Sequence, residues 1–313
     1  MPRLTHVIAT AAAAVALTAT LAVPAVAAQR PSTHTAASSP EYYLSLGDSL
    51  SVGDQPNAKG VTLPTNQGYA NQLYRALVKD NSNLKLWKLG CPGETSHTLN
   101  LGGICGYKGV SRTSLTADKG AQLATALAFL HAHPGQVPLI TIDIGANDLN
   151  ACIALGSIPK IVKCLNPVFP VIAKNLAFTL GALRKADPQA TIVGMSYYVP
   201  ELADWLTGPA GQQFAQGAIL LGEQFNTSVL GAVYKQAGAA VADVFTSFDS
   251  ADMKDMVTLP GLGTLPKDVA LICKWTWECA PKPVGPNEHA NAFGYGVIAG
   301  TFLATLKTIK FPV

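Results

Sequence analysis

Short apolar runs alternate with longer helical patterns along most of this chain, and no other feature limits its possible folds as strongly. Strands that alternate with helices form parallel βαβ units with right-handed crossovers. A parallel sheet covered on both faces needs strands that are apolar almost throughout, and residues 139–144 are close to that pattern. We therefore predict an α/β fold of three layers, αβα, with a parallel sheet between two layers of helices. The strand-like runs are 42–46, 84–89, 137–144, 190–195 and 239–244, and the helical patterns are 69–78, 121–130, 172–184, 211–234 and 292–306.

The N-terminal residues have the layout of a secretory signal peptide. Arg3 precedes an apolar stretch that ends in small residues up to Ala28. We predict a signal peptide at 1–28, a disordered leader rich in Ser, Thr, Ala and Pro at 29–40, and a single domain at 41–313. A membrane anchor is the alternative for the first segment, but its apolar stretch is short and is broken by Pro24. No later run is long and apolar enough for us to expect a stable membrane span.

The charge pattern gives no reason to expect a nucleic-acid partner. The formal net charge is +3, and no basic run is interleaved with aromatic residues. Charged residues make up only 13% of the chain, which suits an exported protein that acts on an uncharged or amphiphilic substrate. We expect a monomer.

All six cysteines follow the predicted signal peptide. An even number of cysteines in an exported chain predicts disulfide bonds, and pairing between neighbours closes each loop within one connecting segment. A zinc site is the alternative, but no Cys-x-x-Cys occurs and no histidine lies near two cysteines at zinc-finger spacing. The expected pairs are Cys91–Cys105, Cys152–Cys164 and Cys273–Cys279.

Polar residues and glycines follow three of the predicted strands, where ligands bind in open α/β sheets. Ser49 follows the first strand in Gly-Asp-Ser-Leu, Gly93 follows the second, and Asn147 follows the third in Gly-Ala-Asn-Asp. Ser49 is a candidate nucleophile, while Gly93 and Asn147 can donate hydrogen bonds to a substrate oxygen. Each also has a structural interpretation: a helix N-cap, a turn glycine and an Asx turn respectively.

His289 is the best candidate for a general base. It lies just before the last helical pattern, whereas His131 and His133 lie at a helix end, where the helix dipole and solvation explain them. His97 lies in a loop rich in Thr and Ser, and His34 lies in the leader.

Taken in order, Gly-Asp-Ser-Leu, a loop glycine, Gly-x-Asn-Asp and a late histidine resemble the four sequence blocks of the SGNH (GDSL-type) hydrolases. The resemblance extends from Leu46 to Gly294. It implies a flavodoxin-like fold with Ser49 as nucleophile and His289 as base. It also implies an oxyanion hole made by the backbone N–H groups of Ser49 and Gly93 and by the side chain of Asn147.

Two further features make the resemblance more specific. The three cysteine pairs and the segment 198–200 (Tyr-Val-Pro) are similar to those of secreted actinobacterial lipases and esterases. The expected protein is therefore secreted and extracellular. No cluster of metal ligands, phosphate loop or dinucleotide fingerprint occurs, so we expect no metal and no cofactor.

The sequence departs from the family at one position. Most members have an aspartate three residues before the histidine, and this chain has Pro286 there. Loss of the carboxylate from a true triad costs about 10⁴-fold in turnover. We predict that the backbone carbonyl of Pro286 orients His289 instead, with the side chains of Asn287 and Glu288 as alternatives.

These features predict a serine esterase or lipase that hydrolyses carboxylic esters, with fatty-acyl esters favoured by the apolar composition. Phospholipids and acetylated polysaccharides remain open as substrates. Because fold alone does not fix function, two alternatives stand beside the hydrolase. One is a catalytically silent binding protein, which the missing aspartate would explain, and the other is an acyltransferase.

Overall fold

The five predicted strands form one parallel sheet. The structure, a computed structural model, describes residues 40–108, 111–114 and 120–312, so the predicted signal peptide and nearly all of the predicted leader lie outside the described residues. The strand order is β4-β1-β7-β8-β9, which is 2-1-3-4-5 in chain order and is the flavodoxin-like arrangement. The prediction of a flavodoxin-like α/β fold is confirmed. The strands are β1 (Glu41–Gly47), β4 (Leu84–Lys88), β7 (Leu139–Asp143), β8 (Thr191–Met195) and β9 (Ala240–Ala242).

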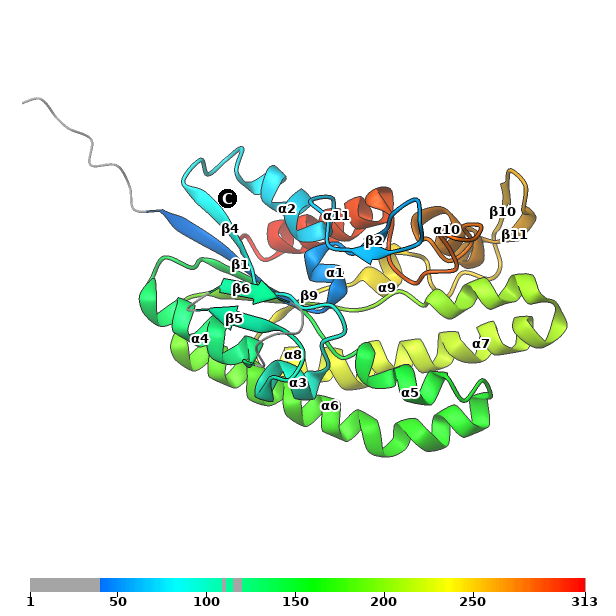
Figure 1. The fold of residues 1–313 in the computed structure, drawn as a ribbon, viewed down its shortest axis with the longest axis horizontal. Helices are drawn as coiled ribbons and strands as arrows, with labels where there is room; N and C mark the ends of the chain where they lie inside the picture. The colour runs from blue at the N-terminus through cyan, green and yellow to red at the C-terminus, as the bar shows by residue number, and fades with distance from the viewer. Residues whose placement is uncertain (1–39, 109–110, 115–119, 313) are drawn as a thin grey trace, which may run out of the picture. The chain divides into compact units, whose positions relative to one another are not determined.

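Helices cover both faces of the sheet (Figure 1). Helices α2 and α11 pack against each other on one face, and α4, α6 and α8 lie on the other. This gives the three predicted layers, because each face of an apolar sheet must be buried by a helix layer. The bounds are α2 (Tyr69–Leu77), α4 (Gln122–Ala132), α6 (Ile158–Ala186), α8 (Ala232–Gln236) and α11 (Ala292–Thr308).

Helix α6 begins well before the predicted start at residue 172. It contains Pro167 and Pro170, which ordinarily end or kink a helix. Its buried side chains recur every three or four residues from Ile161 to Leu183, so one stripe of the helix faces the core. Contrary to our expectation, α6 is long and apolar enough by length and composition to cross a membrane. A core helix passes the same test, so the absence of a membrane span stays a prediction.

The predicted helix at 211–234 is divided in the structure. Its middle turns are π-helical, which shifts the side chains that face the sheet relative to a regular helix. The side-chain amide of Asn226 in this segment bonds both the N–H and the C=O of Tyr197, at 2.7 and 2.8 Å. The segment therefore ties this helix to the chain that leaves β8. The three parts are α7 (Pro209–Gln224), η3 (Phe225–Gly231) and α8.

Short helices and hairpins lie between the main elements along the chain. The sequence did not predict the three antiparallel hairpins that lie outside the sheet, β2–β3, β5–β6 and β10–β11.

The predicted disulfide pairs are confirmed: Cys91–Cys105, Cys152–Cys164 and Cys273–Cys279. The hairpin strands are β2 (Gln55–Pro56), β3 (Thr62–Leu63), β5 (Gly106–Lys108), β6 (Ser111–Ser114), β10 (Met256–Leu259) and β11 (Gly263–Pro266). The short helices are α1 (Ser49–Val52), α3 (Ser96–Leu101), η1 (Asn147–Leu149), α5 (Asn150–Ile153), η2 (Pro200–Thr207), α9 (Val244–Ser247) and α10 (Lys267–Trp275).

Candidate active site

The turn after β1 presents Ser49 at the start of α1. Gly47 has φ of +135°, and a Cβ there would lie 2.3 Å from the backbone oxygen of Asp143, so only glycine fits this approach. Asp48 is the N-cap of α1, and its carboxylate accepts hydrogen bonds from the N–H of Leu50 and the hydroxyl of Tyr197, both at 2.9 Å. The interpretation of Ser49 as the N-cap is therefore wrong. Within the described residues, the Ser49 hydroxyl has no hydrogen-bond partner, which leaves it available for chemistry.

The three predicted oxyanion donors differ in whether their N–H groups already donate hydrogen bonds within the protein. The amide of Asn147 donates one hydrogen bond to the carbonyl of Glu94 at 3.0 Å, and its oxygen accepts one from Asn150 at 3.1 Å. One amide hydrogen of Asn147 therefore remains for a ligand. The backbone N–H groups of Ser49 and Gly93 have no partner among the described residues, and Gly93 is exposed with φ of +77°.

Gln122 holds the nucleophile turn and the glycine loop together. Its amide bonds both backbone groups of Gly47, at 2.7 and 2.9 Å, and donates to the carboxyl of Glu94 at 3.1 Å. Burial raises the pKa of Glu94, which favours its neutral form. Nothing in the sequence points to Gln122, because a glutamine in the first turn of a helix has no motif around it.

A pair of buried carboxyl groups lies beneath the nucleophile turn. Asp143 accepts a hydrogen bond from the Tyr69 hydroxyl, and its other oxygen lies 3.3 Å from the backbone nitrogen of Asp48. Burial, followed by the charge of Asp48, raises the pKa of Asp143 well above its usual range, and burial also raises the pKa of Asp48. Two neighbouring carboxyl groups in an apolar setting favour sharing one proton, so this pair carries less than its full negative charge.

His289 is buried, and its partner is not the predicted one. Its Nδ1 lies 2.9 Å from Oδ1 of Asn287, whereas the described residues show no hydrogen bond between His289 and the carbonyl of Pro286. The structure therefore contradicts the prediction for Pro286, and the contact to Nδ1 comes from Asn287, one of the two alternatives. The other alternative, Glu288, approaches Nδ1 only to 3.8 Å. Burial lowers the pKa of His289, and the charges of Glu288 and Asp48 partly offset this effect, so the neutral imidazole is favoured.

Ser49, Asn147 and His289 line one cavity of about 780 Å³, although they come from segments far apart in the sequence. Ser49 follows β1 and Asn147 follows β7, so the cavity lies at the point where the strand order reverses. Gly93 is not among the lining residues. In the described part of the chain, no hydrogen bond joins the Ser49 hydroxyl to His289; such bonds are often long in unliganded enzymes.

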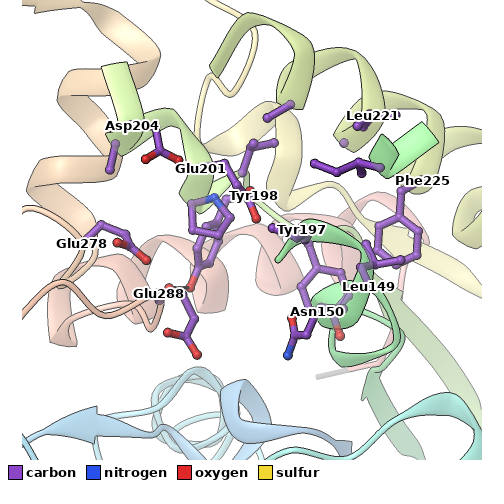
Figure 2. A pocket seen from close by; sticks show the side chains of 18 of the residues that line it. Leu149, Asn150, Tyr197, Tyr198, Glu201, Asp204, Leu221, Phe225, Glu278 and Glu288 are labelled. Atoms are coloured by element: carbon purple, nitrogen blue, oxygen red, sulfur yellow. Dashed lines mark hydrogen bonds between the residues drawn. The ribbon is translucent and has the colours of Figure 1, made fainter. Parts of the chain in front are cut away.

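The cavity has two sides of different chemistry (Figure 2). Leu149, Leu221 and Phe225 lie on one side, and four carboxylates gather on the other. Lysine and arginine are absent from the described lining residues. The four carboxylates belong to Glu201, Asp204, Glu278 and Glu288.

Two of these carboxyl groups titrate close to neutral pH. Burial raises the pKa of Glu201 to about 7, and burial together with the neighbouring charges of Glu288, Glu201 and Asp204 raises the pKa of Glu278 to about 7. The acidic side of the cavity therefore becomes more negative as pH rises through neutrality. Among the described residues, no group of three or more His, Cys, Asp or Glu side chains is placed to hold a metal ion.

Comparison with known proteins gives structural likenesses at low sequence identity. No family model matches the sequence, and no curated protein matches it. The chain is similar to the extracellular lipase of Streptomyces rimosus, with 16% identity and a TM-score of 0.54, over 85% of this chain and 99% of that one. It is also similar to phospholipase A1 of Streptomyces albidoflavus NA297, with 16% identity and a TM-score of 0.49, over 86% and 99%. The first of these shows that the chain shares the fold of that lipase.

Proposed function

We propose that this chain is a secreted serine esterase that hydrolyses carboxylic esters, with fatty-acyl esters as its main substrates. The observation that carries the proposal is that Ser49, Asn147 and His289 meet in one cavity at the switch point of the sheet. The predicted export signal and the three disulfides support secretion. The likeness to the S. rimosus lipase is in keeping with ester hydrolysis. We propose a monomer of one domain that needs no metal or cofactor.

The reaction proceeds in two acyl-transfer steps. His289 takes the proton of the Ser49 hydroxyl as its oxygen attacks the ester carbonyl, and then gives that proton to the leaving alcohol. An acyl-enzyme remains on Ser49. His289 next takes a proton from water, the resulting hydroxide attacks the acyl carbon, and the carboxylic acid leaves as the proton returns to Ser49.

The negative charge that forms on the carbonyl oxygen in both steps needs hydrogen-bond donors. The unpaired N–H groups of Ser49 and Gly93 and the free amide hydrogen of Asn147 are the donors we assign to it. Gln122 fixes the spacing between the first two, because it bonds both Gly47 and Glu94. Donors held in place before the reaction need no reorganisation when the charge develops.

The apolar side of the cavity supports the assignment of a fatty-acyl substrate. Side chains from α5, α6, α7 and η3 line it, including Ile161, Leu165 and Phe225. A volume of about 780 Å³ is within the range of small-molecule pockets and is far more than an acetyl group needs. Each methylene buried there contributes about 0.8 kcal/mol to binding. We therefore expect activity to rise with acyl length before it falls.

The test is hydrolysis of p-nitrophenyl esters from acetyl to palmitoyl, together with labelling by a serine-reactive phosphonate. Wild type is expected to hydrolyse the esters and to take up one label, while Ser49→Ala abolishes both and His289→Ala abolishes turnover. Ser51→Ala is the matched control, since Ser51 lies in the same helix but donates to the carbonyl of Asp48. A wild type that neither turns over nor takes up label would refute the esterase and favour a binding protein. Acyl transfer to an added alcohol that exceeds free acid would identify an acyltransferase.

A further inference from the structure

The side chain of Asn287 holds the ring of His289 through hydrogen bonds whose directions can be assigned. Oδ1 of Asn287 lies 3.1 Å from the backbone nitrogen of His289 and 2.9 Å from its Nδ1. Nδ2 of Asn287 donates to the hydroxyl of Thr62 at 2.9 Å. Because a backbone N–H can only donate, the atom that faces it must be the amide oxygen. The orientation of the amide is therefore fixed by the main chain.

This orientation determines which ring nitrogen carries the hydrogen. An amide oxygen can only accept, so the 2.9 Å contact requires a hydrogen on Nδ1 of His289. A neutral imidazole has one N–H, and Nε2 then holds the free lone pair. In the described part of the chain, Nε2 has no hydrogen-bond partner. The ring is thus in the tautomer that a general base facing a serine needs.

We propose that Asn287 is the positioning residue of the candidate base and takes over the place of the carboxylate that most related enzymes carry three residues before the histidine. The proposal rests on the proposed function of His289. Asn287 acts through His289 and touches no reacting atom. It supplies the orienting acceptor without a charge, so it selects the tautomer but stabilises the imidazolium less than a carboxylate does.

Asn287 is well anchored for this role. Its backbone N–H donates to the carbonyl of Trp277 at 3.3 Å, and the Trp277 N–H donates to the carbonyl of His289 at 3.0 Å. The hydroxyl of Tyr198 donates to the carbonyl of Glu288 at 2.7 Å. The contact with Thr62 adds a link to β3, which lies more than 200 residues earlier in the chain. Together these bonds hold the segment 287–289 on several sides.

The neighbouring groups are poor substitutes for Asn287. The carboxylate of Glu288 is 3.8 Å from Nδ1, too far for a hydrogen bond, and its side chain is 63% exposed. Solvent therefore screens its charge. Asp48 is the other charged group that acts on His289, and its carboxylate is already bonded to Leu50 and Tyr197.

The experiment compares Asn287→Ala, Asn287→Asp and the matched control Asn291→Ala, in protein labelled with ¹⁵N-histidine. Asn291 lies two residues after His289, as Asn287 lies two before it, and it caps α11 without touching the ring. Long-range ¹H–¹⁵N spectra report the tautomer, and the His289→Ala variant assigns the signal. Wild type and Asn291→Ala are expected to show hydrogen on Nδ1, while Asn287→Ala shows a mixture of tautomers.

Activity provides the second readout. We expect Asn287→Ala to lower kcat by about 10²-fold with little change in KM, less than the about 10⁴-fold for a triad carboxylate. Asn287→Asp should restore most of the activity and move the acid limb of the pH profile upward, because a carboxylate stabilises the imidazolium. An unchanged Nδ1 signal in Asn287→Ala, with activity within about threefold of wild type, would overturn the proposal. If wild type hydrolyses no ester, the proposed function fails, while the spectra still decide whether Asn287 sets the tautomer.

Discussion

Replacement of Asn147 by alanine removes one of the three proposed oxyanion donors. In the structure, one amide hydrogen of Asn147 is committed to the carbonyl of Glu94 at 3.0 Å, and the other has no partner among the described residues. The substitution therefore deletes one donor toward the substrate and two hydrogen bonds within the protein, one to the carbonyl of Glu94 and one from the side chain of Asn150. The two losses have different consequences and can be separated.

The loss of the donor should appear in kcat. Removing a single oxyanion donor typically costs about 10² to 10³-fold in turnover, or about 2.7 to 4 kcal/mol of barrier. KM should change little, because the charge on the carbonyl oxygen develops only in the transition state. The lost bond to Glu94 should cost about 1 kcal/mol of stability. Asn147→Asp should lower kcat further, because a carboxylate donates nothing and repels the oxyanion.

The assay is steady-state hydrolysis of p-nitrophenyl butyrate, with thermal unfolding measured beside it. Asn100→Ala is the matched control, since the amide of Asn100 also donates to a backbone carbonyl at 3.0 Å, and its oxygen also accepts a side-chain bond. The control should show a similar loss of stability and wild-type kcat. Activity of Asn147→Ala within about threefold of wild type would refute the assignment, as would an equal loss in Asn100→Ala.

Four further outcomes follow from the same geometry. Ala218→Trp should fill part of the apolar side of the cavity and lower kcat/KM for dodecanoyl esters but not for butyryl esters. A series of esters of increasing acyl length should show a loss of about fourfold for each methylene that the tryptophan excludes. His289 must be neutral to act as a base, and burial lowers its pKa, so the acid limb of the kcat/KM profile should lie below pH 6.5. An acid limb above pH 6.5 would contradict the assignment of His289 as the base. Glu201 and Glu278 ionise near pH 7, so the preference for neutral over anionic esters should grow between pH 6 and 8 in paired assays. Gly47→Ala should lower the free energy of unfolding by at least about 2 kcal/mol in urea denaturation, because its Cβ would collide with the neighbouring strand; an unchanged midpoint would show that the turn can relax.

The sequence predicted the elements whose local pattern and tertiary environment agree. Each of the five strands lies within one or two residues of its predicted bounds, because buried parallel strands must be apolar regardless of which neighbours they pair with. The carboxyl end of each strand was therefore known as well. Ser49, Gly93 and Asn147 could be identified from their positions just after those ends.

The bounds and regularity of the helices could not be predicted from the local sequence. Pro167 and Pro170 would ordinarily end or kink a helix, yet α6 continues through them because buried side chains from Ile161 to Leu183 pack it on its neighbours. The π-helical turns of η3 leave no mark on the hydrophobic period. The bonds from Asn226 to Tyr197, which fix that segment in place, depend on a partner about 30 residues away.

The sequence by itself determined the fold class, the disulfide pairing and the identity of the candidate nucleophile, base and oxyanion donors, because each depends on residue type and order along the chain. Tertiary structure alone decided how these groups are held. Gln122 joins two loops from different strands, and Asn287 reaches Nδ1 of His289 where Pro286 was predicted. Such contacts depend on side-chain direction, and direction is set by the packing of segments that are distant in sequence.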